Sequence, residues 1–258
     1  MLISKALIDP LKPKGSKGLV TIVGAGGKTG TMFALAKELK ALGKRVLITT
    51  TTAIYQPGEK DYDLCHTGDT KSLLDASGTG DSPEQVGEIV VWGSRTDSQG
   101  KLQGVEPEAV DDLWRQAAFS WILVEADGAK GKNLKAPREG EPVVPKETTV
   151  FIGVIGMQSL GKPVHEGNVH RLENFTEITG TKPGDRIDEQ VLRRLIVHEK
   201  GLFKGIPPGA KPLLLLNQCE DLKIRKGARA LGKSLSIPFM VTSLKEEELY
   251  DYENKKKV

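Results

Sequence analysis

Short apolar runs alternate with segments of helical periodicity along most of this chain. Runs that are almost entirely apolar are typical of strands buried on both faces of a sheet, and apolar spacings of three and four are typical of helices. The pattern predicts strands at residues 18–23, 45–50, 88–92, 121–124, 150–155, 212–216 and 238–241. It predicts helices at residues 28–42, 69–75, 107–118, 188–198 and 226–235. This alternation predicts an α/β fold with a mostly parallel sheet covered by helices on both faces.

Two stretches interrupt the alternation. Residues 93–104 are polar and rich in glycine, which indicates a hairpin or a surface loop. Residues 127–145 form a longer loop that contains Pro137, Pro142 and Pro145. A long ordered loop after a central strand is more often functional than decorative. We expect one domain over residues 1–258, with a small helical insertion at about residues 157–208.

Composition narrows the functional classes. The chain has 37 Lys and Arg against 34 Asp and Glu, and the resulting net charge of +3 does not favour nucleic acid as a partner. No apolar run reaches the ~18 residues of a membrane span, and the first residues lack the apolar core of a signal peptide. Cys65 and Cys219 stand apart without CxxC spacing. We therefore expect a cytoplasmic protein without disulfides.

The strongest chemical signal is a glycine-rich turn between the first predicted strand and helix. Its sequence is Gly24-Ala25-Gly26-Gly27-Lys28-Thr29. Glycines let backbone N–H groups curl around a phosphate, and a helix N-terminus adds partial positive charge. We expect the four residues 24–27 to hold phosphate, Lys28 to reach the β- and γ-phosphates, and the Thr29 hydroxyl to bind Mg²⁺.

The turn departs from the usual G-x-x-x-x-G-K-[ST] pattern, because Ile22 stands where the first glycine belongs. The shortened G-x-x-G-K-T form resembles the nucleotide turn of Mur-type amide ligases. Two alternatives stay open, a dinucleotide turn built on Gly24, Gly26 and Gly30 and a tight turn without any ligand. A dinucleotide turn is disfavoured because the second strand ends in threonines rather than in a carboxylate.

Polar residues follow two of the predicted central strands. Residues 121–124 lead into Glu125 and Asp127, where a phosphate-binding sheet needs an acid to hold Mg²⁺ or to orient water. We expect Asp127 to join Thr29 at the metal and Glu125 to orient water, with Glu125 turned toward the sheet face. Thr50 and Thr51 leave the second strand toward the same crevice and are candidates to contact Mg²⁺ or the γ-phosphate, or they reflect strand propensity alone.

A candidate base-reading segment follows the strand at residues 212–216. Asn217-Gln218-Cys219-Glu220 resembles a relaxed form of the N-K-x-D motif of GTP-binding proteins, with Gln218 and Glu220 replacing Lys and Asp. Asn217 and Glu220 are therefore candidate nucleotide contacts, or the segment is an ordinary strand-to-helix cap. The choice between ATP and GTP stays open.

The loop after Asp127 is basic. It either grips an anionic substrate near the phosphates or is a solvated loop. Its basic residues are Lys130, Lys132, Lys135 and Arg138.

These motifs together resemble those of the YqeC family of selenium-dependent hydroxylase accessory proteins. The matching segments are residues 23–29, 47–52, 124–129, 134–137, 141–145, 169–171 and 216–217. The resemblance implies a soluble nucleotide-binding protein that serves maturation of molybdenum hydroxylases with a labile selenium ligand. A molybdenum hydroxylase or its cofactor would then be a partner.

Taken together, the motifs predict Mg²⁺-dependent binding and hydrolysis of ATP or GTP at a phosphate loop like that of P-loop NTPases. The predicted catalytic residues are Lys28, Glu125 and Asp127. Two alternatives remain, a non-catalytic nucleotide switch that docks on a client enzyme and a small-molecule kinase or ligase.

Overall fold

A single sheet of nine strands runs through the computed structural model, which describes residues 17–78 and 87–253. The strand order is β13-β12-β11-β9-β1-β7-β2-β5-β4, and all neighbours are parallel except β12 and β13. The strands of this sheet are β1 (Gly18–Gly24), β2 (Arg45–Thr50), β4 (Leu64–Thr67), β5 (Glu88–Gly93), β7 (Trp121–Glu125), β9 (Val150–Gly156), β11 (Lys211–Asn217), β12 (Phe239–Ser243) and β13 (Glu248–Glu253).

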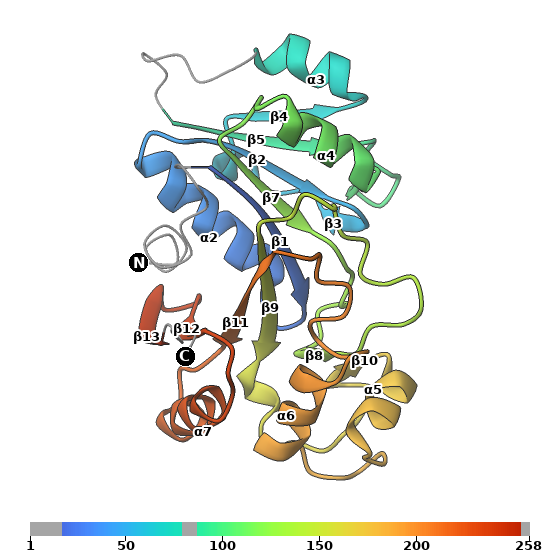
Figure 1. The fold of residues 1–258 in the computed structure, drawn as a ribbon, viewed down its shortest axis with the longest axis vertical. Coiled ribbons are helices and arrows are strands. Elements are labelled where there is room, and N and C mark those ends of the chain that lie inside the picture. The colour runs from blue at the N-terminus through green and yellow to red at the C-terminus, as the bar shows by residue number, and fades with distance from the viewer. Residues whose placement is uncertain (1–16, 79–86, 254–258) are drawn as a thin grey trace.

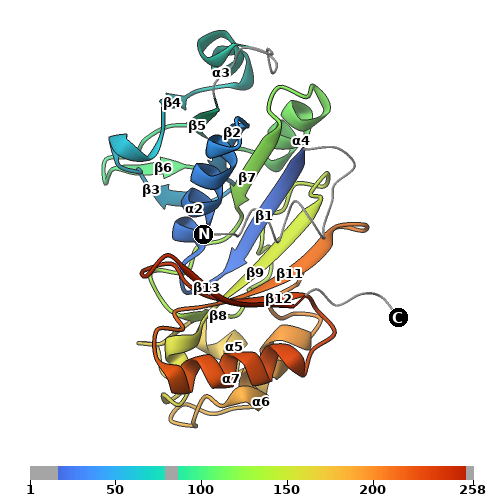
Figure 2. The same ribbon diagram turned by 90° about the vertical axis from the view of Figure 1, so that its left-hand side faces the viewer.

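Helices cover both faces of the sheet, as predicted. Residues of β1 pack on both faces of the sheet. Val20 and Ile22 belong to the buried cluster that contains α2 (Lys28–Ala41). Leu19 and Val23 point to the other face and belong to clusters that contain the other helices. Figure 2 shows α2 in front of the strands and α4 behind them. The remaining helices are α3 (Thr70–Ser77), α4 (Pro107–Arg115), α5 (Leu172–Thr179), α6 (Glu189–Val197) and α7 (Leu222–Lys233).

The helices divide between the two ends of the sheet. In Figure 1, α3 and α4 lie near β4 at one end, and α5, α6 and α7 gather near the other. Helix ends agree with local capping chemistry, since Asp69, Asp188 and Asp221 each cap a helix by accepting a hydrogen bond from a backbone N–H of its first turn. Among the described helices, none is both long and apolar enough to cross a membrane.

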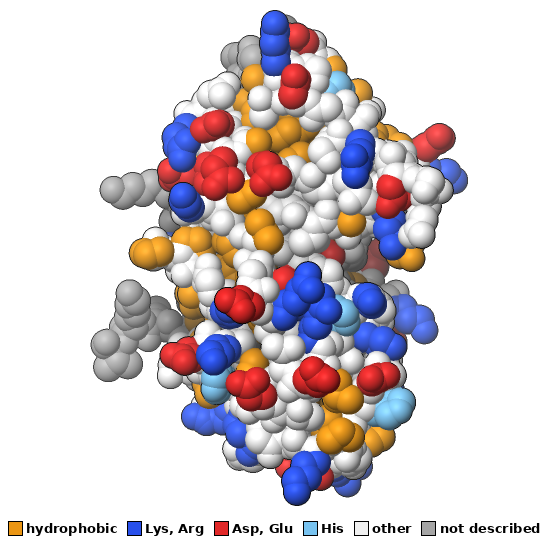
Figure 3. All heavy atoms as spheres, turned by 90° about the vertical axis from the view of Figure 1, so that its right-hand side faces the viewer, with side chains coloured by type: hydrophobic (Ala, Val, Ile, Leu, Met, Phe, Trp, Pro, Cys, Tyr) orange, Lys and Arg blue, Asp and Glu red, His pale blue; other side chains and the backbone are white. Residues whose placement is uncertain are grey.

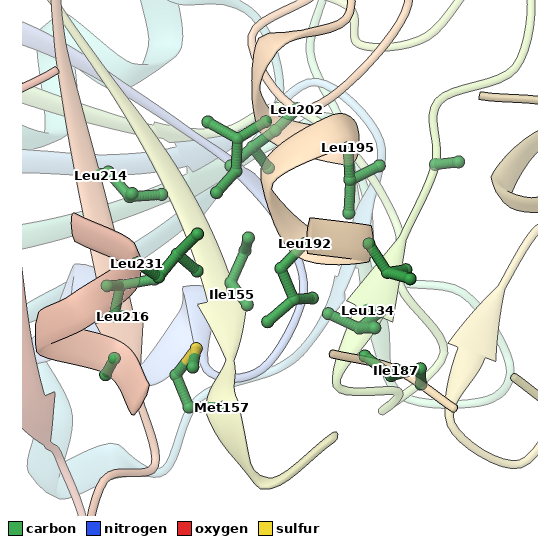
Figure 4. Packing of buried hydrophobic residues seen from close by; sticks show 14 of the residues in the cluster. Leu134, Ile155, Met157, Ile187, Leu192, Leu195, Leu202, Leu214, Leu216 and Leu231 are labelled. Carbon is green, nitrogen blue, oxygen red and sulfur yellow. The ribbon is translucent and has the colours of Figure 1, made fainter. Parts of the chain in front are cut away.

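The segment between β9 and β11 contains two helices. It comprises the 3₁₀ turn η2 (Met157–Ser159), the short strand β10 (Val169–His170), α5 and α6. Figure 4 shows Leu192 of α6 beside Ile155 of β9, and both belong to one cluster of buried apolar residues with Leu231 of α7. The helical segment therefore shares its core with the sheet.

Several short elements were not predicted. They are β4, β13, α5, the 3₁₀ turn η1 (Glu59–Asp61), and two small ribbons, in which β3 (Ala53–Tyr55) pairs with β6 (Lys101–Gln103) and β8 (Leu134–Lys135) pairs with β10. Residues 94–103 form the expected hairpin, with the Ser94 N–H donating to the Gln103 carbonyl. The strand β6 of that hairpin also pairs antiparallel with β3, which extends a ribbon over the end of β2.

Candidate functional site

Three of the four positions in the turn between β1 and α2 require glycine. Gly24, Gly26 and Gly27 have φ angles of +94°, +88° and +126°, which disfavour any side chain. A Cβ on Gly26 would lie 2.2 Å from the Cα of Gly156, and one on Gly27 would lie 2.4 Å from Asn217 Nδ2. The chain at this turn is therefore pressed against β9 and β11.

Three amides of the turn are already used within the protein. The N–H of Gly24 donates to Asp127 Oδ2 (3.1 Å), that of Ala25 to the Val154 carbonyl (3.0 Å), and that of Gly26 to the Lys132 carbonyl (3.1 Å). The expectation that the amides of residues 24–26 hold phosphate therefore does not fit this geometry. The first N–H groups of a helix have no partner inside it, so the amides that could receive an anion are those from Gly27 through the first turn of α2.

Lys28 lies between two carboxylates beneath this helix start. Its Nζ is 3.2 Å from Asp127 Oδ1 and 3.5 Å from Glu125 Oε1, and it donates to the Gly24 carbonyl at 2.9 Å. Burial alone would lower the pKa of Lys28, but the coulombic attraction of Asp127 and Glu125 outweighs it and raises the pKa. Lys28 is therefore held charged next to the amides of the helix start.

Glu125 is the carboxylate that pairs with Thr29. Thr29 Oγ1 donates to Glu125 Oε2 at 2.7 Å, and both residues line a cavity in front of the turn, whereas Asp127 does not. Burial raises the pKa of Glu125, against the opposing effects of Lys28 and Thr29. The expectation that Glu125 turns away from the crevice is wrong, because residues two apart along an extended chain point the same way. Both carboxylates face Lys28, and Glu125 lies closer to the open cavity.

Asp127 belongs instead to a buried series of ion pairs. Its Oδ2 lies 3.1 Å from Lys135 Nζ, which in turn lies 2.8 Å from Glu141 Oε2, and Glu141 Oε1 is 3.2 Å from both Arg138 Nε and Arg171. The Lys135 side chain is fully buried. Lys135 therefore joins the loop to the floor of the site. It is neither a solvated lysine nor one that is free to bind a substrate, the two possibilities that the sequence left open.

The other basic residues of the loop are placed differently. Lys130 and Lys132 line the cavity, whereas Arg138 is more than half exposed and pairs with Glu141. On one face of the molecule lysine and arginine side chains gather near the middle, as Figure 3 shows. The loop therefore supplies two cations to the cavity.

Thr50 and Thr51 do not reach this cavity. Thr50 Oγ1 donates to the Glu125 carbonyl at 2.8 Å and Thr51 Oγ1 to the Val143 carbonyl at 2.7 Å. Both hydroxyls fix neighbouring backbone, and neither residue is among those that line the cavity. The expected contact of Thr50 and Thr51 with Mg²⁺ or a γ-phosphate therefore does not fit the geometry.

Asn217 holds the phosphate turn from the side of β11. Its Nδ2 donates to the Gly26 carbonyl at 2.8 Å, and its Oδ1 accepts from Thr242 Oγ1 and from the Leu244 N–H at 3.2 Å each. The sequence did not reveal this role of Asn217, because Asn217 and Gly26 lie 191 positions apart in the chain. Asn217 therefore positions the turn, whatever ligand lies in front of it.

Glu220 faces the protein rather than the cavity. One of its carboxylate oxygens accepts from Ser243 Oγ at 2.7 Å and the other from Gln158 Nε2 at 3.2 Å. Of the expected base-reading segment, only Gln218 lines the cavity. Its amide oxygen is buried and has no hydrogen-bond partner within the described residues.

The cavity itself has a volume of about 740 Å³ and runs along the edge where the central strands end. This volume lies within the range of small-molecule sites. Among the residues that the structure describes, no group of three or more His, Cys, Asp and Glu side chains could together hold a metal ion. The lining residues from the turn and from β7 are Gly26, Gly27, Lys28, Thr29, Gly30 and Glu125.

Known proteins with similar sequences settle the family. A model of the family described as YqeC protein matches residues 20–173. A protein of Escherichia coli (strain K12) named "Uncharacterized protein YqeC" is 38% identical over 226 residues, which cover 84% of this chain and 86% of that protein. This chain belongs to the YqeC family. The family membership expected from the glycine-rich turn and the later motifs is thereby confirmed.

Among solved structures, two FtsY proteins show weak similarity. Chloroplast FtsY from Physcomitrella patens is 16% identical with a TM-score of 0.31, and the match covers 88% of this chain and 50% of that one. FtsY from Mycoplasma mycoides is 12% identical with a TM-score of 0.32, and the match covers 92% of this chain and 57% of that one. This chain therefore spans about half the length of either structure.

Proposed function

We propose that this YqeC protein binds and hydrolyses a Mg²⁺–nucleoside triphosphate at the cavity in front of α2. The observation that carries the proposal is the hydrogen bond of 2.7 Å from Thr29 Oγ1 to Glu125 Oε2, next to Lys28 at the start of the same helix. P-loop NTPases bind Mg²⁺ and phosphate with a similar set of groups. They place a hydroxyl and a carboxylate next to each other, and a lysine and free helix amides lie beside them.

The residues present fit Mg²⁺. This ion prefers oxygen ligands, retains several waters and needs only one or two carboxylates from the protein. Thr29 and Glu125 would supply a hydroxyl and a carboxylate oxygen, so Glu125 replaces Asp127 in the role first expected of the latter. When bound, the ion would neutralise charge on the phosphate oxygens.

The chain's own groups divide the remaining work. The first-turn amides of α2 and the Lys28 ammonium bind phosphate oxygens, and Lys28 exchanges part of its contact with Asp127 for contact with the ligand. Asp127 keeps Lys28 charged and fixes the Gly24 amide. Gln218 lines the end of the cavity where a base would lie.

We further propose that this reaction serves maturation of selenium-dependent molybdenum hydroxylases in the cytoplasm, with a hydroxylase or its cofactor as partner. This part rests on the resemblance to the YqeC accessory proteins. A non-catalytic switch would use the same residues but would bind nucleotide without turnover. The two lysines of the loop in the cavity favour a third candidate, a transferase with a second substrate.

Calorimetric titration with ATP, GTP and their diphosphates, each with and without Mg²⁺, tests the proposal. Multiple-turnover phosphate release then separates an NTPase from a switch. Lys28→Ala should weaken triphosphate binding by about 2–4 kcal/mol, because a charge-assisted contact is lost. Lys37→Ala is the matched control, since Lys37 lies on the same helix and, among the described residues, pairs with the partly exposed Asp61. Unchanged affinity in folded Lys28→Ala protein would refute the phosphate site.

A further inference from the structure

The cavity has a second end that the nucleotide does not explain. We propose that the end formed by Tyr55, Lys101, Lys130 and Lys132 binds a second small molecule that is planar and anionic, next to the nucleotide. The inference rests on the proposed function only for its statement that the phosphates lie at Lys28. The binding of the second molecule can be measured separately.

Strand order places the two ends on opposite sides of the phosphate turn. Along the edge where the parallel strands end, β11 with Gln218 comes first, then β9, then β1 with the turn, then β7 with Glu125, and then β2, which leads into β3. One continuous cavity touches both Gln218 and Tyr55. A nucleotide with its phosphates in the middle can place its base at only one of these ends, so the other end is left for a different ligand.

The Gln218 end suits the base. Of residues 217–220, the expected base-reading segment, Gln218 is the one that lines the cavity. An amide side chain carries both a donor and an acceptor, so Gln218 suits the mixed donor and acceptor edge of a nucleobase. This leaves the Tyr55 end for the second molecule.

Tyr55 supplies a flat apolar surface at that end. It is 74% exposed on the two-stranded ribbon of β3 and β6, and Lys101 lies directly opposite it in the register. The Lys101 Nζ is 5.2 Å from the centre of the Tyr55 ring. An exposed ring of this kind beside a cavity can stack on a planar ligand, and the neighbouring ammonium favours a ligand with negative charge.

The lysines of this end form no close ion pair. Lys28, Lys37, Lys40 and Lys135 all pair with carboxylates, but within the described ranges no carboxylate lies within 4.0 Å of the ammonium groups of Lys101, Lys130 and Lys132. Lys101 acts at longer range on Asp97, since its backbone N–H and then its charge help to lower the pKa of that carboxyl. Glu125, the one acidic residue among those that line the cavity, is held by Lys28 and Thr29. Three lysines without a close carboxylate around one end of a cavity favour an anion as the ligand.

The loop connects this end to the phosphate turn. Lys132 lines the cavity, and its backbone carbonyl accepts the hydrogen bond from the Gly26 N–H at 3.1 Å. Lys130 and Gly131 hold the loop in a tight bend with positive φ angles of 48° and 70°. An anion held by these lysines would therefore lie next to the turn that carries the nucleotide phosphates.

The test uses phenyl phosphate, which combines an aromatic ring with a phosphate dianion. It is titrated by calorimetry into the full chain saturated with Mg²⁺–ADP, and again without nucleotide, with phenol and inorganic phosphate as single-feature probes. We expect phenyl phosphate to bind alongside ADP and more tightly than either probe. Tyr55→Ala and Lys101→Gln should each weaken that binding about three- to fivefold and leave ADP affinity unchanged. Lys71→Gln, an exposed lysine on α3, is the matched control.

The outcomes separate the second site from the proposed function. Equal phenyl phosphate affinity in the Tyr55 and Lys101 variants and the wild type, or no binding at all, would overturn the second site. Competition between phenyl phosphate and ADP, with ADP affinity also lost in Tyr55→Ala, would show that the nucleobase occupies this end and would equally overturn it. Absence of ATP and ADP binding with retained Tyr55-dependent binding of phenyl phosphate would instead refute the proposed function alone. Both variants lie on an exposed ribbon, and a melting temperature equal to that of the wild type checks their fold.

Discussion

Lys135 places its Nζ 3.1 Å from Asp127 Oδ2, and this ion pair joins the long loop to the floor of the phosphate turn. The same ammonium lies 2.8 Å from Glu141 Oε2, and the Lys135 side chain is fully buried. Asp127 in turn accepts the Gly24 N–H. The loop is therefore joined to the turn through Asp127 and Lys135, in addition to the backbone hydrogen bond between Lys132 and Gly26.

The first prediction concerns this lysine. Lys135→Met removes one ammonium and leaves Asp127 and Glu141 buried without it, so the free energy of unfolding should fall by about 3–5 kcal/mol. Urea unfolding followed by circular dichroism measures the loss. Lys37→Met removes an exposed ion pair with Asp61 and should cost at most about 1 kcal/mol. Equal losses in the two variants would show that the buried series of ion pairs does not stabilise the loop.

A second prediction separates the two strand-end carboxylates. Glu125→Gln should reduce the Mg²⁺-dependent part of ATP affinity roughly ten- to hundredfold, the equivalent of a hydrogen bond to a charged group. Asp127→Asn should chiefly lower stability, because an amide NH₂ would face Lys28 or Lys135. ATP titrations with and without Mg²⁺, beside urea unfolding of both variants, measure the difference. A larger loss of Mg²⁺ dependence in Asp127→Asn than in Glu125→Gln would show that Asp127, rather than Glu125, is the metal ligand.

A third prediction follows from His170 on β10. Burial, with the charges of Arg171, Lys135 and Lys130, lowers the pKa of His170 from 6.5 to about 4, against the opposing effect of Glu141. Between pH 6.5 and about 4 the unfolded chain therefore binds a proton that the folded protein does not. The free energy of unfolding should fall as the pH falls through this window, and should not depend on this group above it.

His170→Gln should flatten that part of the pH dependence. Urea unfolding at several pH values between 4 and 7 measures it, and His165→Gln, at an exposed histidine, is the control. Glu141 provides an internal comparison, because burial would raise its pKa but Lys135 and Arg171 hold it at about 2. The contribution of Glu141 is therefore lost only at lower pH, from about 4.5 downward. An unchanged profile in His170→Gln would show that another group causes the loss above pH 4.

The sequence predicted the centre of the sheet better than its edges. Buried parallel strands such as β7 and β9 are nearly continuous apolar runs, which periodicity alone reveals. The edge strands β4 and β13 were missed because they are partly exposed and mix apolar with polar residues. The interpretation of residues 1–258 as one domain stays a prediction, and part of that range lies outside the described residues.

The site was predicted in its residue types but not in its pairings. Lys28, Thr29, Glu125 and Asp127 were all expected near one another because strand ends and helix starts meet at one edge of a parallel sheet. Thr29 donates its hydrogen bond to Glu125 rather than to Asp127. This choice depends on the directions of the side chains at the end of β7, which the residue types alone do not give. The burial of Lys135 depends on the path of the whole loop, which local pattern does not encode.

A last prediction concerns the two cysteines and the proposed role in selenium chemistry. A selenium carrier needs a reactive thiolate. Burial raises the pKa of Cys219 to about 12, its Sγ donates to the Leu216 carbonyl, and burial also raises the pKa of half-buried Cys65. Neither thiol should react quickly with a disulfide reagent in the native protein, and Cys219 should react only on unfolding.

The double variant Cys65→Ser, Cys219→Ala should therefore still support hydroxylase maturation in the native host, because the selenium donor is then a separate molecule. Hydroxylase activity and selenium content in a deletion strain complemented with this variant measure the outcome. Complementation with Lys28→Ala should fail in the same strain, since phosphate binding is lost. Failure of the folded double variant would make one of the two cysteines the carrier. Full activity in the deletion strain without complementation would refute the proposed maturation role itself.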